Sequence, residues 1–288
     1  MSMIKIKWCD PKGGKMVVNH KKDLVYLSWP QLDMLHFVRH CFSTRLGGVS
    51  EGMFSSMNLS FTRGDKETAV RENFERLAAA VGFSTEDIVC SDQTHTTNIR
   101  VVTAEDRGKG ILRDRDYTDV DGMITNVPGI VLATFYADCV PIYLADPVSR
   151  SIGLLHSGWK GTVHNIIKNG IRAMKKTYGA KPANILAGIG PSICGSCYEI
   201  GEDVAAKFRE AYPASQCRQM LFDDRNGKYH LDLWKACRFN LAASGVQPDH
   251  IFEANLCTCC NPQLLFSHRA SGGKRGNLGA FLQIRKED

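Results

Sequence analysis

The chain has 288 residues and a formal net charge of +6, with 43% hydrophobic and 23% charged residues. This composition is ordinary for a globular protein and argues against a disordered or fibrous chain. No apolar run reaches the roughly 18 residues that a membrane span needs. The N-terminus also lacks the apolar core and cleavage site of a signal peptide. We therefore expect a cytoplasmic protein with no membrane partner.

The charge indicates which ligands are expected, and the cysteine content indicates possible metal binding or catalysis. The basic residues are spread along the chain in short clusters, which favours anionic small molecules over nucleic acid. The chain has 11 cysteines. In a cytoplasmic protein such thiols stay reduced, so we expect most to be buried apolar side chains and a few to bind metal or take part in catalysis.

The first half of the chain predicts few elements. Residues 1–35 give no assignable pattern. Residues 40–45 read as a strand, followed by a glycine-rich loop over 46–52. An apolar stripe with helical spacing predicts a helix over 66–81, with Asp65 as N-cap and Gly82 as its end. Residues 98–103 and 121–125 read as strands.

The second half predicts a sheet with helices. Its expected strands are 129–137, 142–145, 151–156, 184–189, 250–256 and 281–285. Its expected helices are 163–178, 202–212 and 232–244. Helices alternate with strands, but short turns join several neighbouring strands, so a mixed sheet is predicted rather than a purely parallel one. No linker or repeat divides the chain, so we expect one mixed α/β domain over 1–288.

Three side chains that suit a metal stand where predicted strands or loops end. They are His95 in a polar loop, Cys139 after a buried strand, and His156 at the end of the next long apolar run. Two imidazoles and a thiolate match the ligand preference of zinc, and three protein ligands leave a position open for water or substrate. Zinc lowers the pKa of bound water to about 7. A Cys139 nucleophile activated by either histidine is the alternative.

The segment after His156 suits an anion. Residues 157–161, Ser-Gly-Trp-Lys-Gly, join a strand to the predicted helix, where backbone N–H groups and Lys160 favour negative charge. Arg45, just before a Gly-Gly pair, is a second candidate anion ligand. A surface position is the alternative for Arg45.

Two cysteine-rich segments stand apart from this site. Cys194 and Cys197 are spaced as CxxC, and Cys257, Cys259 and Cys260 form CxCC. We interpret them as reduced structural thiols in a shared loop region. A zinc site with four cysteine ligands is the alternative, and it requires the fold to bring the two segments together.

The motifs taken in order resemble one family. They are HCFSTRLGGVSEGMFSSMNLSF, QTHT, DGMITNVPGIVLATFYADCVPIYLADP, HSGWKGT, GIGPSICGSCYEIGEDV, LDLWKA and CTCCNPQLLFSHRASGG. This chain resembles the YfiH-like family, also called multicopper polyphenol oxidases or laccase-domain proteins. Its members are also described as zinc-dependent purine nucleoside phosphorylases and adenosine deaminases. The resemblance runs from His40 almost to the C-terminus.

The resemblance implies a fold, a site and an activity. The fold is a single-domain mixed β-sheet sandwich flanked by helices. The metal ligands are His95, Cys139 and His156. The activities are phosphorolysis of inosine, adenosine or 5′-methylthioadenosine to base and ribose 1-phosphate, and deamination of adenosine to inosine.

Further residues are expected near the metal. Asp138 is the expected proton shuttle, and Arg45 and Lys160 are the expected phosphate ligands, with Asn58 near the substrate. The stretch 275–279, Arg-Gly-Asn-Leu-Gly, departs from the Thr-Gly-Arg-like stretch of the family.

Other functions stay open at this point. Copper also binds cysteine and histidine, so a laccase-like polyphenol oxidase is one alternative, although the chain has no HxH pair. An amidase that uses Cys139 on cell-wall precursors is another, and a non-enzymatic zinc protein is a third. The sequence leaves open the preferred nucleoside, the dominant reaction, the physiological metal, the oligomeric state and the role of the two cysteine-rich segments.

Overall fold

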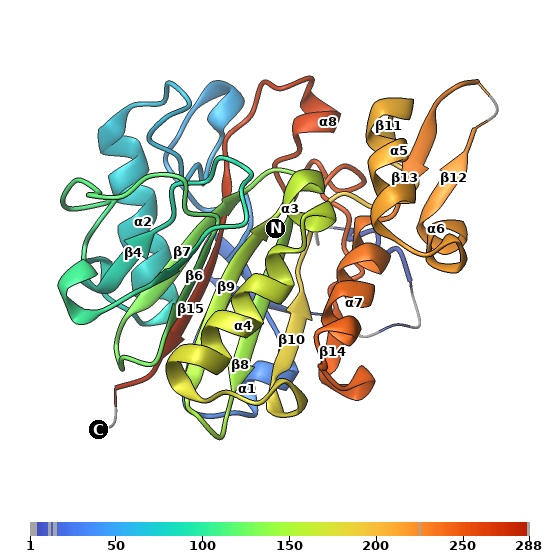
Figure 1. Cartoon of the computed structure of the whole chain (residues 1–288). Helices are drawn as coiled ribbons and strands as arrows, with labels where there is room; N and C mark the ends of the chain where they lie inside the picture. Colours follow the sequence, from blue (N-terminus) through green and yellow to red (C-terminus); the bar gives the residue numbers. More distant parts are fainter. Residues whose placement is uncertain (1–4, 11–12, 14–15, 225, 287–288) are drawn as a thin grey trace.

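Two six-stranded β-sheets pack face to face in the computed structural model, which describes residues 5–10, 13, 16–224 and 226–286 (Figure 1). The core between them contains side chains of both sheets, including Leu132 and Leu282 of the first and Tyr143 and Leu154 of the second. The sheets therefore bury one face each against the other, as in a β-sandwich.

Both sheets are mixed, with parallel pairs at their edges. The pairs β4–β7, β5–β6 and β10–β14 are parallel, and the other pairs within these two sheets are antiparallel. In spatial order the first sheet contains β1 (Val17–Lys21), β2 (Leu24–Ser28), β3 (Val38–Ser43), β15 (Leu278–Ile284), β7 (Val131–Tyr136) and β4 (Ile88–Cys90). The second contains β14 (Ile251–Glu253), β10 (Leu186–Ile189), β8 (Val140–Asp146), β9 (Ser151–Ser157), β6 (Gly122–Thr125) and β5 (Ile99–Val101). The predicted mixed α/β sandwich is confirmed.

Helices cover the outer faces of both sheets. Helix α2 (Glu67–Val81) buries Val70, Phe74 and Leu77 against the first sheet. Helices α4 (Ile166–Tyr178) and α7 (Leu233–Ala243) bury apolar stripes against the second sheet. The other helices are α1 (Pro30–Asp33), α3 (Trp159–Val163), α5 (Glu202–Ala211), α6 (Ala214–Met220), α8 (His268–Ser271) and the 3-10 turns Gly52–Phe54, Thr85–Asp87, Ala104–Asp106, Pro182–Asn184 and Pro248–His250. No helix in the described ranges is long and apolar enough to cross a membrane.

A small third sheet stands to one side of the sandwich (Figure 1). It orders β11 (Glu199–Ile200), β13 (Tyr229–Leu231) and β12 (Leu221–Asp223), with α5 and α6 beside it. Its strands of two or three residues are too short to produce a recognisable alternation, which explains why only α5 was predicted here.

Two local predictions are wrong. The N-cap of α2 is Lys66 without a side-chain cap, because the Asp65 carboxylate accepts hydrogen bonds from Ser50 (2.6 Å) and Asn58 (2.9 Å) instead. The predicted helix over 163–178 begins only at Ile166, as α4, because Asn165 adopts a left-handed backbone with φ of 59°; the residues before it form the separate helix α3, which was not predicted. The unassigned segment 1–35 contributes β1, β2 and α1 from its described residues. One domain over 1–288 stays a prediction.

Candidate metal centre and its pocket

Antiparallel pairing brings Cys139 and His156 together. In the β8–β9 hairpin Pro141 pairs with His156, so Cys139, just before β8, lies at the same end as the histidine. His95 comes from the loop between β4 and β5, and its Nε2 lies 3.9 Å from the Cys139 sulfur. One ligand atom from each of the three residues lies within 4.8 Å of the others. The structure thus brings together the three predicted metal ligands.

One buried carboxylate positions both histidines. Asp121 Oδ1 accepts a hydrogen bond from Nδ1 of His156 at 2.7 Å. The same carboxylate accepts the backbone N–H groups of Thr94, His95 and Thr96 at 2.9–3.0 Å. These bonds hold the loop in a turn in which His95 has φ of 66°. Because Nδ1 of His156 is bonded to Asp121, its Nε2 is left to face the site.

The charges of the trio favour a thiolate. Burial alone would raise the pKa of the Cys139 thiol, but His156 and His95 outweigh it and lower the pKa to about 6. Burial would lower the pKa of His156, but the Cys139 thiolate and Asp121 together raise it to about 9. The protein therefore stabilises the ionised sulfur, which is the form that binds metal.

The backbone leaves room beside these ligands. A Cβ at Gly158 would lie 2.9 Å from Cδ2 of His95 and 3.1 Å from the Cys139 sulfur, so a side chain would collide with the trio. Two imidazole nitrogens and one thiolate, with an open side, fit a zinc ion in its three-ligand catalytic arrangement.

The trio lies in a pocket of about 290 Å³ whose other walls are rich in arginine. Arg115 pairs with Asp92 at 2.9 Å. Within the described ranges, neither Arg63 nor Arg275 forms an ion pair with a carboxylate, and Nε of Arg275 is buried without a hydrogen-bond partner. Burial lowers the pKa of Arg275 to about 10, so it stays cationic at neutral pH. The lining residues are Ser60, Thr62, Arg63, Ser91, Asp92, Gln93, His95, Arg115, Phe135, Ala137, Cys139, His156, Arg275 and Asn277.

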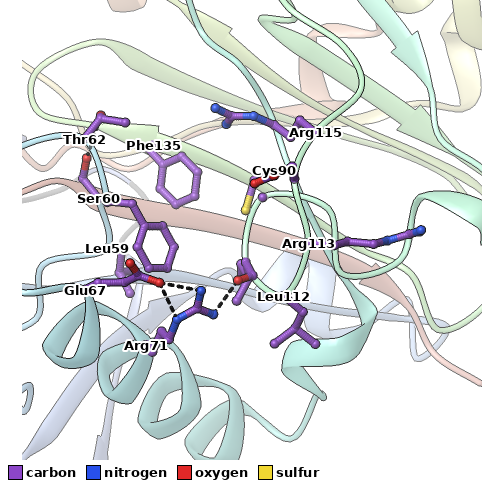
Figure 2. Close-up of a pocket in the computed structure, with 14 residues that line it drawn as sticks. Leu59, Ser60, Thr62, Glu67, Arg71, Cys90, Leu112, Arg113, Arg115 and Phe135 are labelled. Carbon is purple, nitrogen blue, oxygen red and sulfur yellow. Dashed lines mark hydrogen bonds and ion pairs between the residues drawn. The ribbon is translucent and has the colours of Figure 1, made fainter.

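A second pocket of about 330 Å³ adjoins the first and shares Ser60, Thr62, Arg115 and Phe135 with it. Figure 2 shows this second pocket with the Phe135 ring beside Ser60 and Thr62. Below Ser60 in this view, Glu67 accepts hydrogen bonds of 2.7 and 2.9 Å from Arg71. The pocket of the trio therefore opens onto a larger surface shared with the second pocket, which suits a ligand of more than one ring.

Arg45 does not reach this pocket. Its guanidinium donates to the backbone oxygens of Ser55 (2.9 Å) and Pro262 (2.8 Å) and stacks on Phe266. These contacts tie loops together, so the structure does not support the predicted phosphate contact by Arg45.

Lys160 and Asn58 also lie outside the pocket lining. Lys160 is exposed on α3, with its Nζ 5.7 Å from the Trp159 ring. Helix α3 has only five residues, too few for the expected anion site at its N-terminus. Asn58 is fully buried, and its Oδ1 accepts the N–H groups of Ser60 (3.1 Å) and Asn277 (2.9 Å), so it supports two pocket residues from behind.

Asp138 is turned away from the trio. With φ of 94°, it directs Oδ1 to the Thr258 hydroxyl (2.6 Å) and Oδ2 to the Arg269 N–H (2.7 Å). Because one oxygen accepts a hydrogen bond from the segment after β14 and the other from α8, the geometry favours a positioning role over the predicted proton shuttle.

Sequence reasoning missed Asp121, Arg63 and Arg275. Asp121 opens one of the quoted motifs and was read only as the start of a strand. Arg275 lies in the stretch that departs from the family, and that departure was the available signal.

Comparison with known proteins assigns the chain to a family. A family model described as multi-copper polyphenol oxidoreductase laccase matches residues 39–285, and the chain belongs to this family. The chain is 36% identical to purine nucleoside phosphorylase YlmD of Geobacillus stearothermophilus over 85% of this chain and 89% of that protein. It is 33% identical to adenosine deaminase RL5 of an unknown prokaryotic organism over 85% of this chain and 96% of that protein.

The fold matches a solved relative as well. The crystal structure of YlmD from Geobacillus stearothermophilus superimposes with a TM-score of 0.86 at 33% identity, covering 94% of this chain and 100% of that one.

Proposed function

We propose that the protein is a metal-dependent purine nucleoside phosphorylase that converts inosine, adenosine or 5′-methylthioadenosine to base and ribose 1-phosphate. Relatives named purine nucleoside phosphorylase at 36–38% identity support this activity. The observation that carries it is the pair of arginines, Arg63 and Arg275, which line the same pocket as the proposed metal ligands and have no carboxylate partner among the described residues. A pocket with uncompensated guanidinium groups suits a phosphate ion.

The two arginines have the chemistry that a phosphate nucleophile needs. Nε–H of Arg275 has no acceptor among the described residues, and Arg63 donates to the backbone oxygen of Gly273 at 3.0 Å. Together they would hold phosphate while one of its oxygens bonds to C1′ of the ribose and the bond from C1′ to the purine breaks. Fixing the nucleophile in this way lowers the entropic part of the barrier.

The proposed metal ligands are His95, Cys139 and His156, with zinc as the metal. A zinc ion bound there would supply Lewis-acid polarisation of a substrate or water oxygen. Asp121 keeps the proton on Nδ1 of His156 and so orients the ring. The Tyr136 ring, 5.4 Å from that of His156, packs behind it and excludes water from this side.

Adenosine deamination is the second candidate. Similarity to adenosine deaminase RL5 favours it, and the same pocket would serve both reactions. In this reaction water replaces the amino group at C6 and ammonia leaves. Phe135, shared by both pockets, is the aromatic surface on which we place the purine in either reaction.

The test measures base release from inosine and adenosine with and without phosphate, on protein of known zinc and copper content. Phosphate-dependent hypoxanthine and adenine release is expected, with zinc as the bound metal. Arg275→Ala and Arg63→Ala should each raise the KM for phosphate at least about tenfold. Lys160→Ala, exposed and outside the pocket, is the control and should leave it unchanged.

Other outcomes identify other functions. Inosine formed from adenosine without phosphate would show deamination. Copper content with phenol oxidation would favour the laccase-like function, and activity of metal-free protein on amides would favour a Cys139 nucleophile. Unchanged phosphate dependence in both arginine variants would overturn the assignment of the phosphate site.

The location and partners are also proposed. The 11 cysteines are all free thiols, which supports a reducing compartment such as the cytoplasm. The proposed partners are purine nucleosides and phosphate, without nucleic acid or membrane.

A further inference from the structure

Four thiols outside the pocket meet in one cluster. Cys194 and Cys197 lie in the loop after β10, and Cys257 and Cys260 lie just after β14. Strands β10 and β14 are parallel neighbours, and a bridge between Ser192 and Cys257 continues their pairing. The two loops therefore leave the sheet side by side. The four sulfur atoms lie within 4.8 Å of one another, and those of Cys197 and Cys260 are 3.5 Å apart.

The backbone around these sulfurs favours negative charge. The N–H groups of Cys194 and Cys260 point at the Cys257 sulfur at 3.2 and 3.4 Å. Such N–H donors stabilise thiolates more than neutral thiols. Cys194 and Cys257 are buried, so bulk water does not screen the cluster fully. Four thiolates at this separation repel one another strongly unless a cation lies among them.

We propose that Cys194, Cys197, Cys257 and Cys260 bind a second zinc ion in a closed structural site. Two cysteine pairs, each spaced by two residues and drawn from neighbouring loops, are the usual source of a tetrahedral site with four thiolate ligands. Thiolate ligands suit zinc, iron–sulfur clusters and Cu(I), and a tetrahedral set of four thiolates favours zinc or iron. This inference depends on the four thiols and stands independently of the reaction proposed above.

Residues next to the four-cysteine cluster also contact the proposed first metal site. Ile193, next to Cys194, donates its N–H to the backbone oxygen of Asp138 at 3.0 Å. Thr258, next to Cys257, donates its hydroxyl to the Asp138 carboxylate at 2.6 Å. The loop that carries Cys194 and the loop that carries Cys257 thus both hydrogen-bond to Asp138, the residue before Cys139. A metal bound by the four cysteines would fix these two loops relative to each other and so fix the position of Cys139.

Two neighbouring cysteines serve as references. Cys259 lies in the same loop but outside the set of four. Cys9 is an exposed fifth thiol that interacts with Cys194 and Cys257 from the N-terminal segment. We assign neither as a ligand, so serine at either position is expected to leave the second zinc in place.

The experiment measures metal in the full-length chain, purified under reducing conditions without added metal. Two zinc ions per chain are expected, one in Cys139→Ala, and one in Cys197→Ser or Cys260→Ser. These two ligands are only partly buried, so their serine variants are the least disruptive ones. Cys259→Ser, from the same loop, is the matched control and should keep two.

A second readout uses cobalt in the Cys139→Ala background, where only the cluster remains. Intense sulfur-to-cobalt charge-transfer absorption is expected, lost on adding Cys197→Ser and kept on adding Cys259→Ser. Equal zinc in Cys197→Ser and the unmodified chain would overturn the proposal. Iron in the cluster, or intact-mass loss showing disulfides between these cysteines, would also overturn it. Failure of nucleoside turnover with two zinc ions bound would count against the proposed reaction only.

Discussion

Behind the trio, Nδ1 of His156 donates a hydrogen bond of 2.7 Å to Oδ1 of Asp121. This carboxylate, fully buried, also holds the loop that carries His95. One side chain thus positions two of the three proposed metal ligands. A substitution of Asp121 is therefore the most direct way to disturb the site without changing a ligand.

Asp121→Asn should weaken zinc binding at the trio about 10- to 100-fold, because the amide can no longer hold the proton on Nδ1 of His156 as a carboxylate does. Competition against a chelating dye measures this affinity. Asp114→Asn, an exposed carboxylate of the neighbouring pocket wall, is the control. Equal affinity in the two variants would show that the Asp121 bond does not support the metal.

Gly158→Ala should remove zinc from the trio, because the added Cβ would lie 2.9 Å from the His95 ring and 3.1 Å from the Cys139 sulfur. Gly161→Ala is the matched control three residues along, where a Cβ meets its nearest atom at an ordinary 3.4 Å. Zinc content of the two proteins, measured side by side, checks the prediction. Full occupancy in Gly158→Ala would mean that the ligands can move apart to accept a methyl group.

Asp138→Asn separates positioning from proton transfer. The amide keeps only one acceptor oxygen, so either the Arg269 N–H or the Thr258 hydroxyl loses its acceptor, which should lower the free energy of unfolding by about 1–3 kcal/mol. At equal zinc occupancy we expect kcat to fall less than about tenfold, whereas a general acid would account for about 10²- to 10⁴-fold. Thermal unfolding and steady-state kinetics on the same sample decide between the two, and a drop in kcat of that size would restore the proton-shuttle role.

Asp106 makes the free energy of unfolding depend on pH in the acid range. Burial would raise the pKa of its carboxyl, but hydrogen bonds from Lys109, the Thr103 backbone and Arg100 outweigh it and lower the pKa from 3.8 to about 2. The unfolded chain therefore takes up this proton at a higher pH than the folded one. The resulting stabilisation, about 1–2 kcal/mol, is present above about pH 4 and is lost as the pH falls towards about 2.

Comparison with Asp106→Asn isolates this contribution. Denaturant unfolding of the two proteins should differ by that amount at about pH 7 and converge near about pH 2. Metal loss in acid affects both chains and cancels in the difference. If the difference in unfolding free energy between the two proteins stays constant across this pH range, the carboxylate contributes through its shape rather than its charge.

The sequence predicted those parts of the fold that leave a local pattern. The long apolar runs of β7, β8 and β9 were found because both faces of these strands are buried. The stripe of α2 was found because one face of the helix is buried. Strands of two or three residues, such as β11, leave no periodicity to read. The break at Asn165 was missed because the apolar spacing continues across it.

The site divides in the same way. The trio was predicted from residue type and from position at strand ends, and the structure brings its members together; metal binding by them stays a prediction. The pocket wall was not predicted, because tertiary contacts place it. Asn277 donates its N–H to Asn58 across 219 positions of sequence. Arg45 and Lys160 have suitable charge, but the fold directs them elsewhere.

The β8–β9 hairpin bears on the order in which the centre assembles. Its two strands are joined by a turn over residues 147–150, and closing so short a loop costs little entropy. Cys139 and His156 can therefore meet as soon as these neighbouring strands pair. His95 joins only once Asp121, entering with β6, has gathered its loop. A nascent chain would thus offer a thiol–imidazole pair to a metal before the pocket exists. His95, the third proposed ligand, would join when β6 pairs with β9 in the second sheet.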